Sequence, residues 1–308
     1  MFAYKLDPAL AAYVVESGIF TPKTDSLTAQ REAFAEACSH FTPPIPGGVS
    51  VENSEVDGIE IRIYTPDAHA PPAGWPTVLY FHGGGWSLGS HTTHDWFAFA
   101  LLRRAQVAVV SVNYRLAPEH PFPAPLEDGL KVWRALRRGD FPRLNCELLA
   151  VAGDSAGGSL AAGLCVSLRS LELPQPRIQV LAYPVLSARN DLNSMKVHSN
   201  APMLTTAGLL AALEGFVPSE EQKADPRAMA LESKSFGGVA PAFIGVAEYD
   251  PLFDHGAEYA KRLRLAGVPV KLHVGEGLVH ASLRAAGVAQ VEAFYDAIAD
   301  SLRVAMLR

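Results

Sequence analysis

Short apolar stretches alternate with stretches of helical pattern along most of this chain of 308 residues. The apolar stretches predict strands over residues 77–81, 107–112, 148–152, 179–183, 242–247 and 268–273. Helices are expected between and after them, over residues 96–104, 125–137, 159–170, 256–266 and 288–303. Such alternation is typical of a mostly parallel sheet flanked by helices, because each helix returns the chain to the edge where the next parallel strand begins. The sequence therefore predicts the α/β fold class.

Three segments depart from this alternation. Residues 49–64 alternate in polarity around Asp57-Gly58, a dipeptide favoured in tight hairpins, and predict an antiparallel edge to the sheet. Residues 1–45 predict two short helices, 8–16 and 27–38, that end at a breaker rich in Pro and Gly. Residues 188–224 follow a strand and hold one helical stretch between polar runs. An insertion at the carboxyl end of a strand lies on the face where α/β proteins bind ligands, so this segment is expected to cover a pocket.

The composition narrows the class of protein. It is 49% hydrophobic and 19% charged with a net charge of −6, which provides a large core and argues against a nucleic-acid partner. The chain has no run of 18 apolar residues, so no membrane span is predicted, and charges interrupt residues 1–20 as they would not in a signal peptide. The three cysteines, Cys38, Cys146 and Cys165, form an odd set without metal-like spacing, which favours free thiols and a cytoplasmic location.

The strongest chemical signal is Gly153-Asp154-Ser155-Ala156-Gly157, which lies between a predicted strand and a predicted helix. A serine hydroxyl is a weak nucleophile, so an enzyme that uses one exposes it on a tight strand-to-helix turn beside a base. Glycines on both sides of Ser155 allow the strand and helix to approach closely. The pentapeptide alone is a modest signal and needs support from elsewhere in the chain.

That support comes from His82-Gly83-Gly84-Gly85-Trp86, which directly follows another predicted strand. Consecutive glycines let backbone N–H groups face a pocket, as an oxyanion hole requires. A flexible loop or a phosphate cradle would be the alternatives. A phosphate loop would have Lys-Ser or Lys-Thr after its glycines, whereas this chain has Trp86-Ser87, so we interpret the segment as an oxyanion loop.

With these two motifs the chain resembles the hormone-sensitive-lipase family of α/β-hydrolases, the bacterial family IV esterases marked by His-Gly-Gly-Gly and Gly-Asp-Ser-Ala-Gly-Gly. The stretch from Asn113 to Ala124 and the segment Glu248-Tyr249-Asp250-Pro251-Leu252 are similar to two further motifs of that family, in the same order. The resemblance covers nearly the whole chain. It implies an α/β-hydrolase fold with a helical cap, a serine carboxylesterase activity on short-chain esters, and no cofactor.

The resemblance also directs the choice of acid. Asp250 follows a predicted strand and occupies the position of the acid in the family's motif, and a carboxylate at a strand end can orient a histidine on the next loop. Asp254 competes for the same role. The family pattern favours Asp250, and Asp254 is expected to cap the helix that follows.

For the base, the family's order of serine, acid and histidine leaves His255, His273 and His280. His273 falls within a predicted strand, and His255 lies only five positions beyond the acid. His280 follows the last strand through Gly275-Glu276-Gly277, in the loop where the base is expected. The family usually has His-Gly-Phe there, whereas this chain has His280-Ala281-Ser282, which puts the shape of the nearby pocket wall in question.

The oxyanion is expected to meet the N–H groups of Gly83, Gly84 and Ala156, with Gly85 shaping the loop. His82 is expected to shape that loop too. His91, His94 and Asp95 cluster in sequence but lack a second ligand group, so no metal is expected and Asp95 is interpreted as a helix cap. Five residues could line the pocket or belong to the core: Trp86, Tyr183, Met203, Leu204 and Phe216.

Together these features predict a core of residues 46–187 and 225–308, with a helical cap built from residues 1–45 and 188–224. The expected partner is a small-molecule ester, and the sequence does not decide between a monomer and a homodimer. Two other functions remain open. One is an amide or formamide hydrolase with the same triad, and the other is a non-catalytic small-molecule receptor of the same fold, which the presence of Ser155, Asp250 and His280 disfavours.

Overall fold

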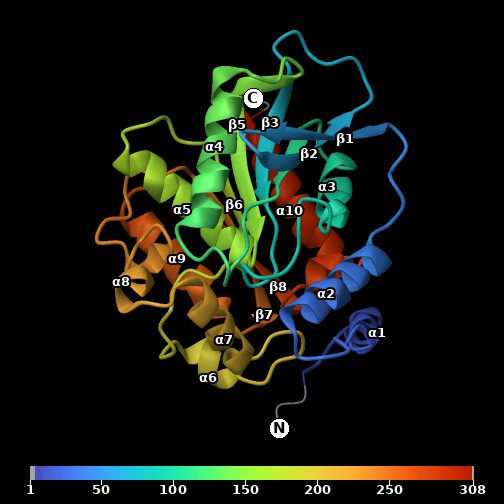
Figure 1. Ribbon diagram of the computed structural model, residues 1–308, viewed down its shortest axis with the longest axis vertical. Helices are drawn as coiled ribbons and strands as arrows, with labels where there is room; N and C mark the ends of the chain where they lie inside the picture. Colours follow the sequence, from blue (N-terminus) through green and yellow to red (C-terminus); the bar gives the residue numbers. More distant parts are fainter. Residues whose placement is uncertain (1–3, 307–308) are drawn as a thin grey trace.

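The structure is a computed structural model that describes residues 4–306. Its centre is an eight-stranded sheet in the order β1-β2-β4-β3-β5-β6-β7-β8 (Figure 1). Only the pairs that involve β2 are antiparallel. The strands are β1 (Val49–Val56), β2 (Ile59–Pro66), β3 (Trp75–Phe81), β4 (Ala108–Val112), β5 (Leu144–Asp154), β6 (Gln179–Ala182), β7 (Ala242–Tyr249) and β8 (Val270–Val279). The predicted α/β class and mostly parallel sheet are confirmed.

The hairpin at the sheet edge forms as predicted. Val56 pairs with Ile59 across the turn, and Asp57 and Gly58 have φ angles of 49° and 80°. Positive φ at both central residues is what a type I′ hairpin turn requires, which explains why aspartate and glycine occupy the positions.

Helices cover both faces of the sheet (Figure 1). One layer holds α4 (Ala124–Arg138), α5 (Ala156–Ser170) and α9 (Phe253–Leu265), and the other holds α3 (Asp95–Leu102) and α10 (Ala289–Met306). Neighbouring residues of β3 alternate between the two layers: Leu79 belongs to the first core cluster and Tyr80 to the second. Because successive side chains of a strand point to opposite faces, a strand buried on both sides has a continuous apolar sequence.

The remaining helices gather at one end of the molecule (Figure 1). They are α1 (Pro8–Ser17) and α2 (Leu27–Phe41) near the amino terminus, and α6 (Asn193–Val197), α7 (Thr206–Phe216) and α8 (Glu220–Lys223) after β6. The sequence predicted only α7 in the second group, because α6 and α8 are too short to show a periodic pattern. Over residues 4–306, no helix combines the length and apolar character needed to cross a bilayer.

The last strand differs most from its prediction. β8 continues to Val279, six residues beyond the expected end, and Val279 pairs with Tyr249 after an irregularity in register. Gly275 and Gly277 were interpreted as loop residues, but they lie inside this strand. The pairing of β8 with β7 therefore carries the chain directly to His280.

Candidate active site

Ser155 occupies a strained turn between β5 and α5. Its φ of 54° and ψ of −119° are unfavourable for a residue with a side chain, and this conformation is the one expected of a nucleophile on a strand-to-helix turn. The flanking glycines explain how the turn fits. A Cβ atom on Gly153 would lie 2.2 Å from the Gly157 carbonyl oxygen, and one on Gly157 would lie 2.0 Å from that of Phe81. Larger residues would push the helix away from the sheet.

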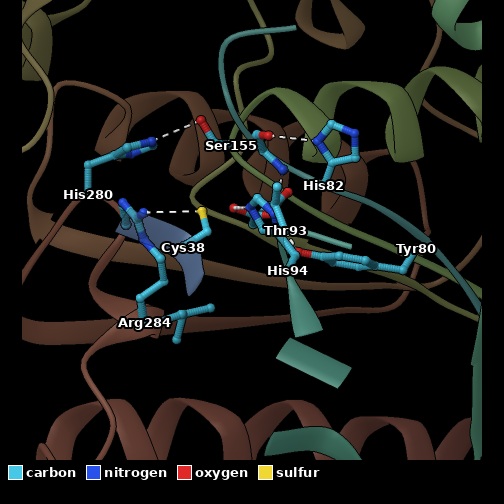
Figure 2. Close-up of polar contacts among 12 residues, drawn as sticks. Cys38, Tyr80, His82, Thr93, His94, Ser155, His280 and Arg284 are labelled. Carbon is cyan, nitrogen blue, oxygen red and sulfur yellow. Dashed lines mark hydrogen bonds and ion pairs between the residues drawn. The ribbon is translucent and has the colours of Figure 1, made fainter. Parts of the chain in front are cut away.

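A chain of hydrogen bonds joins the three predicted catalytic side chains. Ser155 Oγ lies 2.9 Å from His280 Nε2 (Figure 2). His280 Nδ1 lies 2.7 Å from Asp250 Oδ2. Asp250 is fully buried and its other oxygen accepts the Leu252 N–H at 2.8 Å. In the tautomer that satisfies these contacts, Nδ1–H donates to the carboxylate and Nε2 accepts the serine proton. This arrangement can remove a proton from Ser155.

The turn after His280 shows how the chain accommodates its Ala281-Ser282 sequence. Ala281 has a φ of 57°, in the left-handed region that favours glycine. Ser282 Oγ donates to the Val279 carbonyl oxygen at 2.6 Å and accepts the Val279 N–H at 3.0 Å. Tyr13 of α1 donates to the Ala281 carbonyl oxygen at 2.9 Å. Polar contacts and α1 therefore hold the turn.

The residues that competed with His280 and Asp250 for the roles of base and acid lie elsewhere in the fold. His255 is fully buried in α9, its Nδ1 accepts the Leu186 N–H at 3.1 Å, and burial lowers its pKa to about 4. His273 lies in β8, as predicted. The prediction that Asp254 caps its own helix is wrong: the helix starts at Phe253, and the Asp254 carboxylate accepts the Ser194 N–H of α6 at 2.8 Å.

One of the predicted oxyanion donors, Gly83, is wrong in the structure. The Gly83 N–H donates to Asp154 Oδ1 at 2.8 Å, so it is not available to an oxyanion in this geometry. Gly84 and Gly85 line the same cavity as Ser155 and have positive φ angles of 119° and 58°. Within residues 4–306, their N–H groups and that of Ala156 have no hydrogen-bond acceptor. Gly85 was expected only to shape the loop, and it now replaces Gly83 as a candidate donor.

Asp154 is a site residue to which the sequence assigned no role. Its buried Oδ1 accepts the Tyr80 hydroxyl as well as the Gly83 N–H, and its Oδ2 lies 3.7 Å from His94 Nε2. Burial alone would raise the pKa of Asp154, but His94 and the Tyr80 hydrogen bond hold it below its ordinary value. The carboxylate thus connects the glycine loop to the serine turn. Its place directly before Ser155 in the motif was the available signal.

His82, at the start of the glycine loop, packs into the protein interior. It is fully buried and stacks on Tyr114 with ring centroids 4.2 Å apart. Burial lowers the pKa of His82 to about 3, so the ring is neutral at physiological pH. A neutral ring packed in this way fits the predicted loop-shaping role.

The histidines after the loop do not gather around a common centre. His94 faces Asp154, and Asp95 accepts a hydrogen bond from Arg62 at 3.0 Å. In the described part of the chain, no three His, Cys, Asp or Glu residues are placed to hold a metal ion. The prediction that Asp95 caps a helix is wrong, because Asp95 is the first residue of α3 and His94 precedes it at the capping position.

Ser155 and His280 open into a cavity of about 290 Å³. Its wall includes residues from both groups of helices at this end of the molecule, with Phe34 from α2 and Leu209 and Ala212 from α7. Of the five predicted lining residues, Trp86, Tyr183, Met203 and Leu204 do line the cavity. Phe216 does not, because it is fully buried behind Trp86 and stacks on it with centroids 4.3 Å apart.

The chain matches known families and individual proteins. A family profile described as "alpha/beta hydrolase fold" matches residues 78–284, and one described as "Carboxylesterase family" matches residues 22–118. Carboxylesterase NlhH of Mycobacterium tuberculosis is 41% identical over 234 residues, which cover 72% of this chain and 70% of that protein. Ethyl acetate hydrolase of Pseudomonas putida is 34% identical over 293 residues, covering 91% of this chain and 92% of that protein.

Solved structures agree with the sequence relatives. A structure titled "Bacterial Heroin Esterase" has a TM-score of 0.88 at 30% identity and covers 98% of each chain. A thermostable esterase from Pseudomonas putida ECU1011 has a TM-score of 0.91 over 99% of each chain, and at 24% identity it supports the fold alone. The chain therefore belongs to the α/β-hydrolase family, in the hormone-sensitive-lipase-like group that its motifs indicate.

Proposed function

We propose that Ser155, His280 and Asp250 are the nucleophile, the base and the orienting acid of this carboxylic ester hydrolase. The observation that carries the proposal is the hydrogen-bonded chain from Ser155 through His280 to Asp250, at the wall of a cavity. The strained turn at Ser155 supports it, because a fold maintains such a conformation mainly where the side chain must be exposed to a reactant.

The reaction follows from these contacts. His280 Nε2 takes the proton of Ser155 as Oγ attacks the ester carbonyl, and the buried Asp250 carboxylate stabilises the imidazolium that forms. The imidazolium then protonates the leaving alcohol, and an acyl-serine remains. The same histidine takes a proton from the water that attacks the acyl-serine, and it gives this proton to Ser155 Oγ as the acid leaves.

The proposed oxyanion donors are the N–H groups of Gly84, Gly85 and Ala156. The support is that Gly83 is bonded to Asp154, whereas the two following glycines line the cavity with Ser155. Ala156 begins α5, so its N–H lies at the helix amino terminus, where the partial positive charge favours an anion.

The size of the cavity supports short esters. A volume of about 290 Å³ is at the lower end of the range for small-molecule sites, and Leu204, Leu209 and Ala212 make part of its wall apolar. The relative named ethyl acetate hydrolase is consistent with a substrate of this size. We therefore propose acyl and alcohol groups of only a few carbons.

The organisation of the chain is part of the proposal. Residues 1–45 and 188–224 would form a cap over the core of residues 46–187 and 225–308, which is supported by the contributions of α2 and α7 to the cavity wall. A cytoplasmic location is proposed because Cys38, Cys146 and Cys165 are unpaired, as expected in a reducing compartment.

Replacement of the nucleophile tests the proposal. Ser155→Ala is expected to abolish hydrolysis of p-nitrophenyl butyrate and labelling by a fluorophosphonate, without lowering the urea midpoint of unfolding. The matched control is Ser167→Ala on the same helix, whose hydroxyl donates to the Gly163 carbonyl oxygen and which is expected to retain activity. Turnover by Ser155→Ala at the wild-type rate would overturn the assignment.

The leaving group needs a separate comparison, because the triad geometry does not select an ester over an amide. The wild-type protein is expected to cleave p-nitrophenyl butyrate with a higher kcat/KM than the matched butyryl p-nitroanilide. A preference for the anilide would assign an amide hydrolase on the same site. Binding of both compounds without turnover would assign the receptor function.

A further inference from the structure

Arg284 is a buried arginine in the wall of the proposed active site. It ends the short η2 turn (Ser282–Arg284), four residues after His280, and the residue is 9% exposed. It lines the cavity that contains Ser155, and it also lines an adjoining hollow beneath α2. Figure 2 shows its guanidinium group reaching Cys38, in the same region of the site as His280.

The groups around Arg284 do not neutralise its charge. Guanidinium Nη1 lies 3.6 Å from Cys38 Sγ, but burial raises the pKa of Cys38 to about 11, so the thiol is neutral. The carbon Cζ lies 5.6 Å from the centre of the Phe34 ring, which is also uncharged. Within residues 4–306, no carboxylate oxygen lies within 4.0 Å of its nitrogen atoms.

The acidic residue that lines the same cavity as Arg284 is already engaged. Asp154 is the one acid among the described residues that line the cavity, and it accepts hydrogen bonds from Tyr80 and Gly83 and faces His94. An arginine remains protonated at physiological pH, and a buried charge is costly unless it is paired. A bound anion, such as a charged group of the substrate, would supply the counter-charge that Arg284 lacks in the cavity wall.

We propose that Arg284 binds a carboxylate on the substrate, and that the enzyme prefers esters carrying a carboxylate in addition to the scissile ester, such as half-esters of dicarboxylic acids. The planar guanidinium matches a carboxylate with two parallel hydrogen bonds. Leu88 and Met203 line the cavity as well and provide apolar contact for the carbons between the two groups. This inference rests on the proposed function of Ser155.

Matched substrate pairs test the preference in the wild-type protein. For the acyl half, p-nitrophenyl pentanoate is compared with mono-p-nitrophenyl glutarate, which replaces the terminal methyl group by a carboxylate. For the alcohol half, butyl acetate is compared with 4-acetoxybutanoate. After subtraction of the uncatalysed rate, kcat/KM is expected to be about tenfold higher or more for the anionic member of at least one pair, the gain expected of a hydrogen bond to a charged group. A preference for the neutral member in both pairs would overturn the inference.

Variants assign the preference to the residue. Arg284→Met removes the charge at similar length and is expected to lower the ratio of anionic to neutral kcat/KM by about tenfold or more, mainly through KM. Arg284→Lys keeps the charge without the planar fork and is expected to retain part of the ratio. The control is Arg303→Met, which removes a charge from the surface of α10 where Arg303 pairs with Asp300. An equal fall of the ratio in Arg303→Met would show that overall charge, and not Arg284, sets it.

Failure of this inference is distinguishable from failure of the proposed function. Hydrolysis of the neutral esters, and its loss in Ser155→Ala, tests the function alone. If the wild type cleaves neutral esters through Ser155 but disfavours the anionic members, the function stands and the role of Arg284 falls. If Arg284→Met does not fold, the wild-type pairs and Arg284→Lys still decide the question.

Discussion

Replacing Asp154 with alanine is expected to damage both the stability and the catalysis of this enzyme, because one carboxylate joins three parts of the site. It accepts the Tyr80 hydroxyl from β3, accepts the Gly83 N–H at 2.8 Å, and lies 3.7 Å from His94 Nε2 before α3. Asp154 is 4% exposed, so water cannot readily replace these partners. Asp154→Asn is the matched control, since its amide oxygen can still accept from Tyr80 and Gly83.

The magnitude follows from the groups left behind. Each buried donor without an acceptor costs about 1–3 kcal/mol, so the loss of two predicts a fall of about 2–6 kcal/mol in the free energy of unfolding of Asp154→Ala. Asp154→Asn removes only the charge and is expected to lose about 1–2 kcal/mol. Because the folded-state pKa of Asp154 is lowered, its contribution is present above the unfolded pKa and disappears as pH falls through the folded value. The comparison therefore belongs at pH 7.

Asp154→Ala is also expected to lower kcat, because Asp154 holds the glycine loop in place. The N–H groups of Gly84 and Gly85 follow directly after Gly83, so freeing Gly83 misaligns the proposed oxyanion donors. Loss of one such donor costs about 10²- to 10³-fold in kcat, and we expect Asp154→Ala to approach this range with little change in KM.

Urea unfolding and steady-state kinetics with p-nitrophenyl butyrate measure the two effects. The reasoning is refuted if Asp154→Ala loses less than about 1 kcal/mol, or if Asp154→Asn loses as much as Asp154→Ala. It is also refuted if Asp154→Ala loses stability but keeps the wild-type kcat, because the carboxylate would then not hold the loop.

Two further changes test the surroundings of the triad. Ala281→Gly is expected to raise the free energy of unfolding by up to about 1 kcal/mol, because it relieves a left-handed conformation, and a lower urea midpoint would contradict this account. His255 is buried with a pKa of about 4, so between pH 6.5 and about 4 the unfolded chain binds a proton that the folded protein does not, and stability falls as pH falls. His255→Asn is expected to flatten this dependence in urea unfolding at pH 7 and pH 5, and an unchanged slope would show that other groups cause it.

The parallel sheet could be predicted because each of its strands is a short apolar run bounded by polar or glycine-rich segments. The prediction failed where local composition and long-range pairing disagree. Gly275 and Gly277 weaken a strand locally, yet β8 continues through them because β7 supplies its hydrogen bonds as far as Val279. Helices α6 and α8 were missed for a related reason, since turns this short are stabilised by contacts such as the Ser194 N–H with Asp254.

Within the site, the sequence identifies residues whose role requires one particular side chain. It does not identify residues whose role depends on how the folded chain is packed. Ser155, Asp250 and His280 were selected by type and order, and the structure brings them together. Of the three predicted oxyanion donors, Gly84 and Ala156 remain candidates, whereas Gly83 does not, because the partner of the Gly83 N–H is decided by the direction of one peptide group. No sequence pattern records that direction.

Asp154 and Arg284, the two charged residues that line the cavity with Ser155 and His280, show why specificity is harder to predict from a sequence than mechanism. Asp154 is met by donors from β3, from the glycine loop and from the segment before α3, and these draw its charge away from the cavity. Arg284 lies against Phe34 and the Cys38 thiol of α2, neither of which carries a compensating charge. A substrate that carries a carboxylate would therefore be oriented with that group towards α2 and its ester towards Ser155. Helix α2 would then do more than contribute to the cavity wall, because it places uncharged groups beside the arginine and leaves its charge for the substrate.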